Sequence, residues 1–288
     1  MSGWLVTGAG GMLGRDVVGV LRGRGEDVTG LGHRDLDVTD EAAVLAAIRR
    51  CRPEVVINCA AWTAVDAAEA AEDEALLVNG RGAGYVAAAC AATGSRLVQV
   101  STDYVFAGDG QRPYAEDDRP APRTVYGRTK LAGEQAVLGL LPESGLVVRT
   151  AWLYGGAGPS FVHTMIRLAG QRRFVDVVDD QRGQPTWTVD VAQQLAALAA
   201  PGVPAGIYHA TSCGETTWFD LARAVFALLG TDPDRVRPTT SEAYPRPAPR
   251  PANSVLGHAR HSLAGIAPIG DWQDALRRAW PTLVAPQG

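Results

Sequence analysis

The sequence predicts an α/β protein whose larger part is a doubly wound, Rossmann-type parallel sheet and whose smaller C-terminal part is an α/β cap. Three observations lead to this fold class. An apolar run near the start leads into a glycine-rich turn and a helical pattern. Apolar runs and helical patterns then alternate five or six times within about 150 residues, as in parallel sheets with helices on both faces. Beyond residue 154 the alternation loosens, although aromatic and aliphatic residues recur.

The N-terminal turn carries glycines at positions 8, 10, 11 and 14, between a strand expected at Trp4 to Val6 and a helix. Gly8 and Gly11 can adopt turn dihedrals closed to other residues, which lets backbone N–H groups at a helix N-terminus approach a pyrophosphate. Gly14 would let the helix pack closely on the strand. Leu13 occupies the last glycine position of G-x-G-x-x-G, so the turn alone also has a plain interpretation as a strand-to-helix connection.

The rest of the first 153 residues repeats this alternation of strand and helix. Thr39 or Asp40 is expected to cap the helix that carries Val44, Leu45 and Ile48 on one face. Continuous apolar runs predict strands that are buried on both faces of a parallel sheet. The expected strands are 27–32, 53–61, 96–102 and 146–152, and the expected later helices are 81–93 and 126–140.

The remaining residues predict shorter and less regular elements. We expect helices at 161–168, 188–200, 218–229 and 272–280, a loop at 155–159, a polar segment at 176–185 between short strands, a strand at 206–210 that returns to the sheet, and a proline-rich loop at 237–251. These elements divide the chain into a dinucleotide-binding domain, 1–153 plus about 187–210, and a substrate-binding domain, about 154–186 and 211–288.

Composition excludes several classes of protein. The 288 residues are 46% hydrophobic and 20% charged, as in ordinary globular proteins. The net charge is −4 and the 27 basic residues are dispersed, so we expect no nucleic-acid partner. No apolar run approaches the length of a membrane span and no signal segment precedes the first strand, so a cytoplasmic protein without a membrane partner is expected. The four cysteines lie far apart, which favours buried, reduced thiols.

Tyr126 and Lys130 stand at i and i+4 at the start of a predicted helix, and this spacing puts both side chains on one face. There the ammonium can lower the pKa of the phenol and help it exchange a proton near neutral pH. The plain alternative is a half-buried tyrosine beside a solvated lysine.

Polar residues also follow two predicted strands at their carboxyl ends, where open α/β sheets bind ligands. The Thr102 hydroxyl can hydrogen-bond a substrate carbonyl beside Tyr126, or it caps a turn. The small residues after Asn58 allow a cofactor to lie against the backbone.

In this order, these motifs resemble the extended short-chain dehydrogenase/reductase superfamily and, more narrowly, the dTDP-4-dehydrorhamnose reductase family. The resemblance spans nearly the whole chain. It rests on the glycine turn, Asp37–Val38, Asn58–Asp66 with Glu69, Ser101–Phe106, Val125–Glu134, Arg149–Trp152, Asp180–Thr186, Gly206–His209 and Arg250–Ser254.

The resemblance implies reduction of the C4 ketone of a dTDP-6-deoxy-4-keto-L-hexose with a nicotinamide hydride, most simply dTDP-4-dehydro-L-rhamnose. Tyr126 then donates the proton, Lys130 lowers its pKa and binds the nicotinamide ribose, and Thr102 orients the C4 oxygen. Asp103, Tyr104 and Trp152 match the sugar pocket, although Trp152 is alternatively a core aromatic. Arg250 meets the substrate diphosphate or is a solvated loop charge. The positions matching cofactor contacts are Gly11, Met12, Leu13, Asp37, Val38, Ala60, Ala61, Trp62, Thr63 and Asn79.

The end of the second strand bears on the choice of cofactor. A carboxylate there would bind the ribose 2′-hydroxyl of NADH. This chain has Gly32-His-Arg34, so NADPH is expected, while Asp35 leaves NADH open. Asp37 is assigned to the adenine.

We expect no metal. Some relatives are described with magnesium bound by glutamates at a dimer contact, whereas this chain has Arg15-Asp16 near that point, so monomer and homodimer both remain open. His258 and His261 are expected to be surface histidines rather than zinc ligands. The run Glu116 to Asp118 is expected to be a solvated loop.

Two other functions remain open. One is a 4-ketoreductase acting on another dTDP-deoxysugar of antibiotic biosynthesis. The other is a non-catalytic, nucleotide-binding regulatory subunit. Intact Thr102, Tyr126 and Lys130 argue against the second, because a scaffold has no need of all three.

Overall fold

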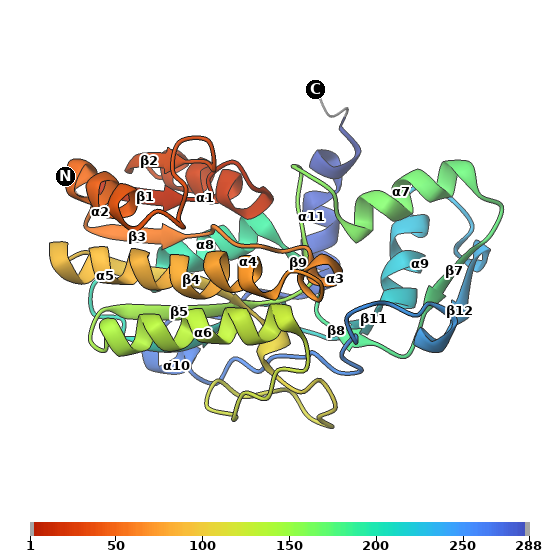
Figure 1. Cartoon of the computed structure of the whole chain (residues 1–288). Helices are drawn as coiled ribbons and strands as arrows, with labels where there is room; N and C mark the ends of the chain where they lie inside the picture. Colours follow the sequence, from red (N-terminus) through yellow and green to blue (C-terminus); the bar gives the residue numbers. More distant parts are fainter. Residues whose placement is uncertain (1–2, 286–288) are drawn as a thin grey trace.

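A six-stranded, wholly parallel sheet forms the larger part of the molecule in the computed structural model, which describes residues 3–285 (Figure 1). Its strand order is β10-β5-β4-β3-β1-β2, so the order reverses between β1 and β3. Open α/β sheets bind ligands beside the carboxyl ends of the strands at such a reversal. The strands are β1 (Gly3–Thr7), β2 (Asp27–Leu31), β3 (Val55–Asn58), β4 (Arg96–Thr102), β5 (Gly145–Thr150) and β10 (Gly206–His209).

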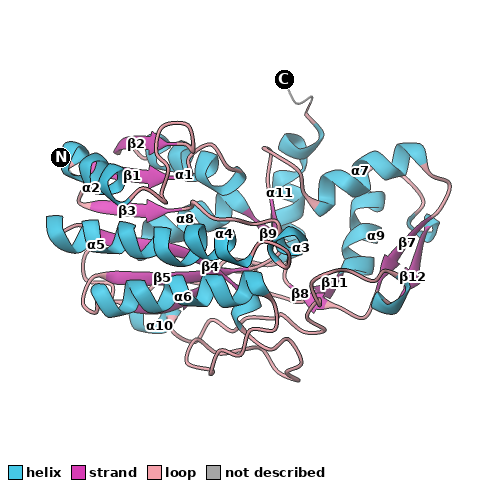
Figure 2. Cartoon of the chain, viewed as in Figure 1, coloured by secondary structure: helices cyan, strands magenta, loops and turns pink. Residues whose placement is uncertain are grey.

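Helices cover both faces of this sheet, which confirms the predicted doubly wound arrangement (Figure 2). One face carries α1 (Met12–Gly23) and α8 (Thr188–Leu198), and the other carries α2 (Glu41–Cys51), α5 (Ala83–Thr93) and α6 (Val125–Leu140). The strand β10 pairs with β5, so the chain returns to the sheet as predicted. Asp40, one of the two expected caps, accepts a hydrogen bond from the Ala43 amide at the start of α2.

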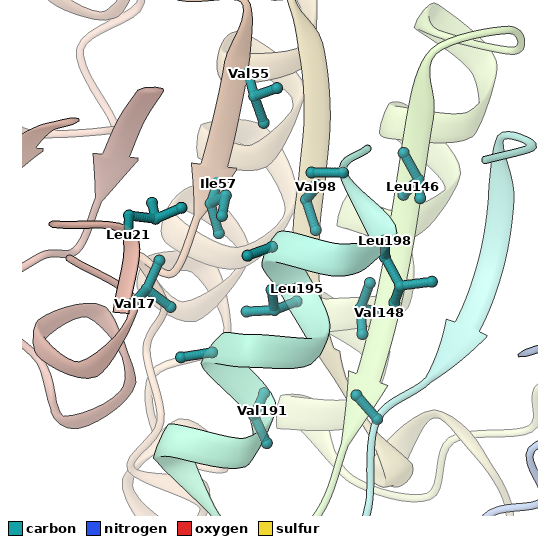
Figure 3. Packing of buried hydrophobic residues seen from close by; sticks show 14 of the residues in the cluster. Val17, Leu21, Val55, Ile57, Val98, Leu146, Val148, Val191, Leu195 and Leu198 are labelled. Atoms are coloured by element: carbon teal, nitrogen blue, oxygen red, sulfur yellow. The ribbon is translucent and has the colours of Figure 1, made fainter. Parts of the chain in front are cut away.

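Successive side chains of each strand point to opposite faces of the sheet, so each layer of helices packs on its own hydrophobic core. In β1, Trp4 and Val6 pack toward α1 and α8, whereas Leu5 packs toward α2 and α5. Figure 3 shows the first of these cores, where Leu195 of α8 lies over the sheet among side chains of β3, β4 and β5. Because β3 and β5 are buried on both faces, each contains a continuous apolar run, residues 55–57 and 146–148.

The smaller part has its own core between α7 (Phe161–Gln171), α9 (Trp218–Leu228) and α11 (Trp272–Val284). A two-stranded parallel sheet of β7 (Val175–Val178) and β12 (Val236–Thr239) lies at its outer edge (Figure 1). The prediction of a loop from 237 onward is therefore wrong for the first three residues. Pro238 is tolerated in β12 because this strand has a single partner. Helix α11 runs four residues beyond its predicted end.

Short elements connect the two parts. Strand β6 (Leu153–Tyr154) pairs with β9 (Thr186–Trp187), and β8 (Arg182–Gly183) pairs with β11 (Thr216–Thr217). The carboxylate of Asp190 on α8 binds the guanidinium of Arg278 on α11 at 2.5 Å, which ties the smaller part to the sheet. Helix α10 (His261–Ala264) lies against the core of the larger part, since Ala264 packs on it.

Most of the stretch between β3 and α5 is helical, although the sequence pattern predicts no separate element there. It contains α3 (Val65–Ala68), α4 (Glu72–Leu76) and the π-helical turn η1 (Leu77–Gly82). Single 3₁₀ turns occur at η2 (Asp103–Val105), η3 (Pro233–Arg235) and η4 (Ser241–Ala243). Among residues 3–285, no helix is both long and apolar enough to cross a membrane.

Candidate active site

A cavity of about 1080 Å³ opens between the carboxyl ends of the sheet strands and the smaller part. The glycine turn forms one end of it, and the start of α6 and the end of β4 form its middle. The loop of residues 241–251 closes the cavity on the opposite side. Its predicted site residues are Gly11, Met12, Leu13, Gly14, Ala61, Thr63, Thr102, Asp103, Tyr104, Tyr126, Lys130, Trp152 and Arg250.

The glycine turn has the geometry of an anion-binding loop. Gly8 has a φ of +67°, and a Cβ there would lie 2.6 Å from the Ala60 amide nitrogen. A Cβ on Gly14 would lie 2.2 Å from the Gly8 carbonyl oxygen, so helix and strand approach as predicted. Gly11 caps α1 without a side-chain hydrogen bond, and no acid stands in the first turn. The helix N-terminus therefore suits a pyrophosphate.

Residues at the tip of β2 have partners within their own turn. The Asp35 carboxylate accepts the Gly32 amide at 2.9 Å, while Arg34 is exposed. Asp37 accepts hydrogen bonds from the amide and hydroxyl of Thr39, and these hold its pKa below the usual value. Val38 is buried against Gly82 of η1. Because Asp35 is engaged by its own turn, Arg34 is the more available side chain here.

A layer of buried amides supports the loop after β3. Asn58 accepts the Thr7 hydroxyl at 2.6 Å and donates to Gln99 at 2.7 Å, which links three neighbouring strands. Asn79 accepts the Trp62 amide at 2.9 Å and donates to the Trp62 carbonyl at 3.1 Å. Asn79 is buried, and these two hydrogen bonds hold the backbone of the segment Ala60–Thr63 in place.

The three residues expected to perform chemistry meet in the cavity. Lys130 is buried and its ammonium donates to the Val100 carbonyl at 2.7 Å. Burial lowers the pKa of Lys130 to about 8. Burial raises the pKa of Tyr126 to about 12, while a hydrogen bond with Thr102 works in the opposite direction. Desolvation is the largest effect on this phenol, and the Asp103 carboxylate raises its pKa further. The lowering of the Tyr126 pKa by Lys130 stays a prediction.

Asp103 and Tyr104 stand beside this group. The Asp103 carboxylate accepts the Thr102 hydroxyl at 2.8 Å, and its second oxygen has no hydrogen-bond partner among residues 3–285. Burial raises the pKa of Asp103 to about 6. The Tyr104 ring meets the Tyr126 ring edge to face, with centroids 5.6 Å apart. Thr102 also accepts the Tyr104 amide at 3.3 Å, so it caps this turn, while its role toward a substrate stays a prediction.

A buried ion pair between Arg149 and Glu134 lies close to the cavity, and no role in the site is predicted for it from the sequence. Arg149 donates two hydrogen bonds to the Glu134 carboxylate, at 2.9 and 2.7 Å, and both side chains are almost fully buried. Ser101 donates to the same carboxylate at 2.5 Å. Tyr126, Lys130 and Glu134 are spaced four residues apart, so they share one face of the helix. This spacing is the feature of the sequence that points to Glu134. The Glu134 charge favours the protonated form of Lys130.

Trp152 has a φ of +50°, a left-handed conformation that is costly outside glycine. Its ring stacks on Trp218, with centroids 3.6 Å apart and planes 8° from parallel. A Cβ on Gly183 would lie 2.3 Å from this ring. Trp152 also packs against the core of the smaller part, so it serves as both a cavity wall and a core aromatic.

Arg250 lies in the wall of the cavity and is only 23% exposed. Its guanidinium binds Asp66 at 2.8 Å and donates to the Ala248 carbonyl at 2.9 Å. The interpretation of Arg250 as a solvated loop charge is therefore wrong, because the side chain is held at the cavity by two partners.

Two expectations outside the cavity are corrected. His261 is buried, with its ring bound to Gln194 and to the His209 carbonyl, and His258 binds Thr211. His261 is therefore an internal histidine, and His258 is half-buried rather than a solvated surface histidine. Glu116 is also buried, and its carboxylate accepts the Arg260 amide at 3.2 Å.

Cysteines and acids form no further site. The four cysteines are unpaired; Cys90 is buried and the others are half-buried. Within residues 3–285, no cluster of three or more histidine, cysteine or acidic side chains is arranged to hold a metal ion.

Comparisons with known proteins agree with this geometry. The family model described as "RmlD substrate binding domain" matches residues 2–284. The chain is 57% identical over 289 residues to the dTDP-4-dehydrorhamnose reductase of Streptomyces griseus, covering 99% of this chain and 95% of that one. It is 55% identical over 284 residues to the dTDP-4-keto-6-deoxy-D-glucose reductase of Streptomyces niveus, covering 99% and 98%.

A solved structure, the dTDP-4-dehydrorhamnose reductase of Bacillus anthracis in complex with NADP, superposes with a TM-score of 0.93 at 36% identity. The match covers 98% of this chain and 99% of that one. The chain therefore belongs to the dTDP-4-dehydrorhamnose reductase family.

Proposed function

We propose that this protein reduces the C4 ketone of a dTDP-4-keto-6-deoxy-L-hexose with NADPH, and that dTDP-4-dehydro-L-rhamnose is its substrate. The observation that carries the proposal is that Thr102, Tyr126 and Lys130 line the same cavity as the glycine turn. The relatives from Streptomyces are named for reduction of dTDP-4-keto sugars, and the Bacillus anthracis structure contains NADP.

The cofactor is proposed to lie along the first part of the cavity. The pyrophosphate would meet Gly8, Gly11 and the N-terminus of α1, where backbone amides and the helix dipole favour an anion. Exposed Arg34 would contact the 2′-phosphate, and Asp37 and Val38 the adenine side. The segment Ala60–Thr63 would line the nicotinamide side. The bound nicotinamide supplies the hydride that adds to C4.

Tyr126 is proposed to donate the proton that the C4 oxygen takes up as the ketone becomes an alcohol. A phenol whose pKa is raised to about 12 keeps its proton at neutral pH, as a proton donor must. Thr102 would hold the C4 oxygen beside the phenol. Lys130, with a pKa near 8, can return a proton to the phenolate. Asp103, Tyr104 and Trp152 would contact the sugar, and Arg250 the diphosphate.

We further propose that the two parts divide these tasks, with residues 1–153 and about 187–210 binding the cofactor and residues about 154–186 and 211–288 binding the sugar nucleotide, to which the first part also contributes Asp103, Tyr104 and Trp152. The core of β1, α1 and α8 supports this division, since it is separate from the core of α7, α9 and α11.

Replacement of Tyr126 by phenylalanine tests the proposal. Tyr126→Phe should lower kcat by at least about a hundredfold while NADPH binding, followed by nicotinamide fluorescence, stays within about twofold. Tyr85→Phe, on α5 outside the cavity, serves as the matched control and should keep full activity. NADPH oxidation with dTDP-4-dehydro-L-rhamnose should yield one alcohol, identified by NMR. Full turnover by Tyr126→Phe would refute the mechanism.

A further inference from the structure

Asp66 joins the two parts of the molecule across the cavity. It lies in α3 of the larger part, and its carboxylate reaches the loop of residues 241–251. One oxygen accepts the Ala248 amide at 3.3 Å, and the other binds the Arg250 guanidinium at 2.8 Å. Arg246 approaches the same oxygen at 3.9 Å. A single carboxylate thus holds the backbone and two cationic side chains of this loop.

The loop itself is anchored mainly at its ends. At one end, the Ser241 amide and hydroxyl donate to Asp180, each at 2.7 Å. Just beyond the other end, the Asn253 amide donates to the Gly108 carbonyl at 2.9 Å. Most of the intervening residues line the cavity. Asp66 is therefore placed to fix the middle of the loop, where the cationic side chains are.

Hydrogen bonds at both ends of α3 hold the helix that carries Asp66. At the end of its helix, Glu69 accepts the Val125 amide at 2.9 Å, at the start of α6. The Trp62 indole donates to the Ala64 carbonyl at 3.1 Å just before the helix. The position of the Asp66 carboxylate is thus fixed relative to the helix that carries Tyr126.

We propose that Asp66 is a positioning residue that aims Arg250, with Arg246 beside it, at the diphosphate of the bound sugar nucleotide. This inference rests on the proposed function. Asp66, from α3, and the Ala248 carbonyl, from the loop, both bind the guanidinium, so the side chain is held in the cavity wall in a fixed orientation. The three charges sum to +1, which leaves the group attractive to an anion.

The direction of the effect separates positioning from neutralisation. If Asp66 only cancelled charge, its removal would raise the local charge to +2 and strengthen diphosphate binding. If Asp66 positions Arg250, its removal frees the loop and weakens binding, since the arginine must then be ordered when the ligand binds.

The experiment compares Asp66→Asn with wild type. Binding of dTDP, measured by titration calorimetry without turnover, should weaken about tenfold, KM for the sugar nucleotide should rise to a similar extent, and kcat should stay within about twofold. NADPH binding should be unchanged, which shows that the variant is folded. In the Arg250→Gln background, Asp66→Asn should weaken dTDP binding by less than about twofold, because the residue that it positions is gone.

Asp118→Asn is the matched control. Asp118 also binds an arginine, Arg112 at 2.7 Å, and a backbone amide, that of Ala115 at 2.7 Å, but it lies outside the cavity lining. This variant should leave dTDP binding unchanged. Tighter dTDP binding by Asp66→Asn, or a full tenfold loss that persists in the Arg250→Gln background, would overturn the inference. Wild-type protein that binds NADPH but not dTDP would instead contradict the proposed function itself.

Discussion

His209 at the end of β10 is the internal group whose titration has the clearest consequence for stability. The ring is fully buried, and Nδ1 lies 2.8 Å from the Gly257 carbonyl oxygen, so this nitrogen carries the proton. Nε2 is buried without a hydrogen-bond partner among the described residues. Arg149, His258 and His261 all disfavour a positive charge on the ring. Burial, followed by these neighbours, lowers the pKa of His209 to about 3.

The sign of the pH dependence follows from this shift. The unfolded chain takes up a proton on His209 near pH 6.5, whereas the folded protein does so only near pH 3. Above pH 6.5 the ring is neutral in both the folded and the unfolded chain, so it has no effect on the pH dependence. As the pH falls from 6.5 toward 3, the unfolded chain binds a proton that the folded protein does not, so the free energy of unfolding decreases. Each pH unit in this window costs about 1.4 kcal/mol, so acidification from pH 7.5 to 4.5 removes about 3 kcal/mol through this residue alone.

His209→Asn tests this value. The asparagine amide can still donate to the Gly257 carbonyl, but it does not titrate. Urea unfolding followed by tryptophan fluorescence should show the variant less stable than wild type at pH 7.5 and losing about 3 kcal/mol less than wild type by pH 4.5. Titrating groups that do not interact with His209, such as Asp103, remain in both proteins and cancel in the difference. Equal losses in the two proteins would refute the assignment of a buried, neutral His209.

Two glycines beside the cavity give further predictions. Gly14→Ala should weaken NADPH binding at least about tenfold in a fluorescence titration, because its Cβ would lie 2.2 Å from the Gly8 carbonyl and must distort the turn. Gly183→Ala should displace the Trp152 ring, raise KM for the sugar nucleotide and lower the unfolding free energy by about 1–3 kcal/mol. Gly139→Ala, on the exposed side of α6 with open space around its Cβ, is the control and should be neutral or stabilise by about 1 kcal/mol. Unchanged binding in both cavity variants would contradict the close packing described.

The sequence predicted the sheet and the order of its helices because those features depend on local periodicity. Strands buried on both faces appear as apolar runs, and β3 and β5 are such strands. The elements that escaped prediction are short or locally atypical. Helices α3 and α4 have four and five residues, η1 is a π-helix with one internal and one terminal glycine, and β12 contains Pro238. Each is stabilised by its tertiary partner rather than by its own pattern.

The site divides in the same way. Residue type and spacing identified Tyr126, Lys130 and Thr102, because a helix places i and i+4 on one face and a parallel sheet collects its strand ends at one edge. Residue type and spacing do not determine the protonation states of these groups. The direction of the Tyr126 pKa follows from burial, which depends on what covers the phenol. The positions of His258, His261 and Glu116 likewise depend on contacts with distant segments.

By itself, the sequence determined the family, the parallel sheet and the glycine turn, and it singled out Thr102, Tyr126 and Lys130 for the proposed reaction, because all of these depend on short-range patterns. Only the tertiary structure decided how the cavity is closed. Asp66 and Arg250 are 184 residues apart, yet their side chains bind at 2.8 Å. The Glu134–Arg149 pair is buried through the packing of α6 on β5. Charge pairing across such separations is set by the fold, because no local periodicity brings these groups together.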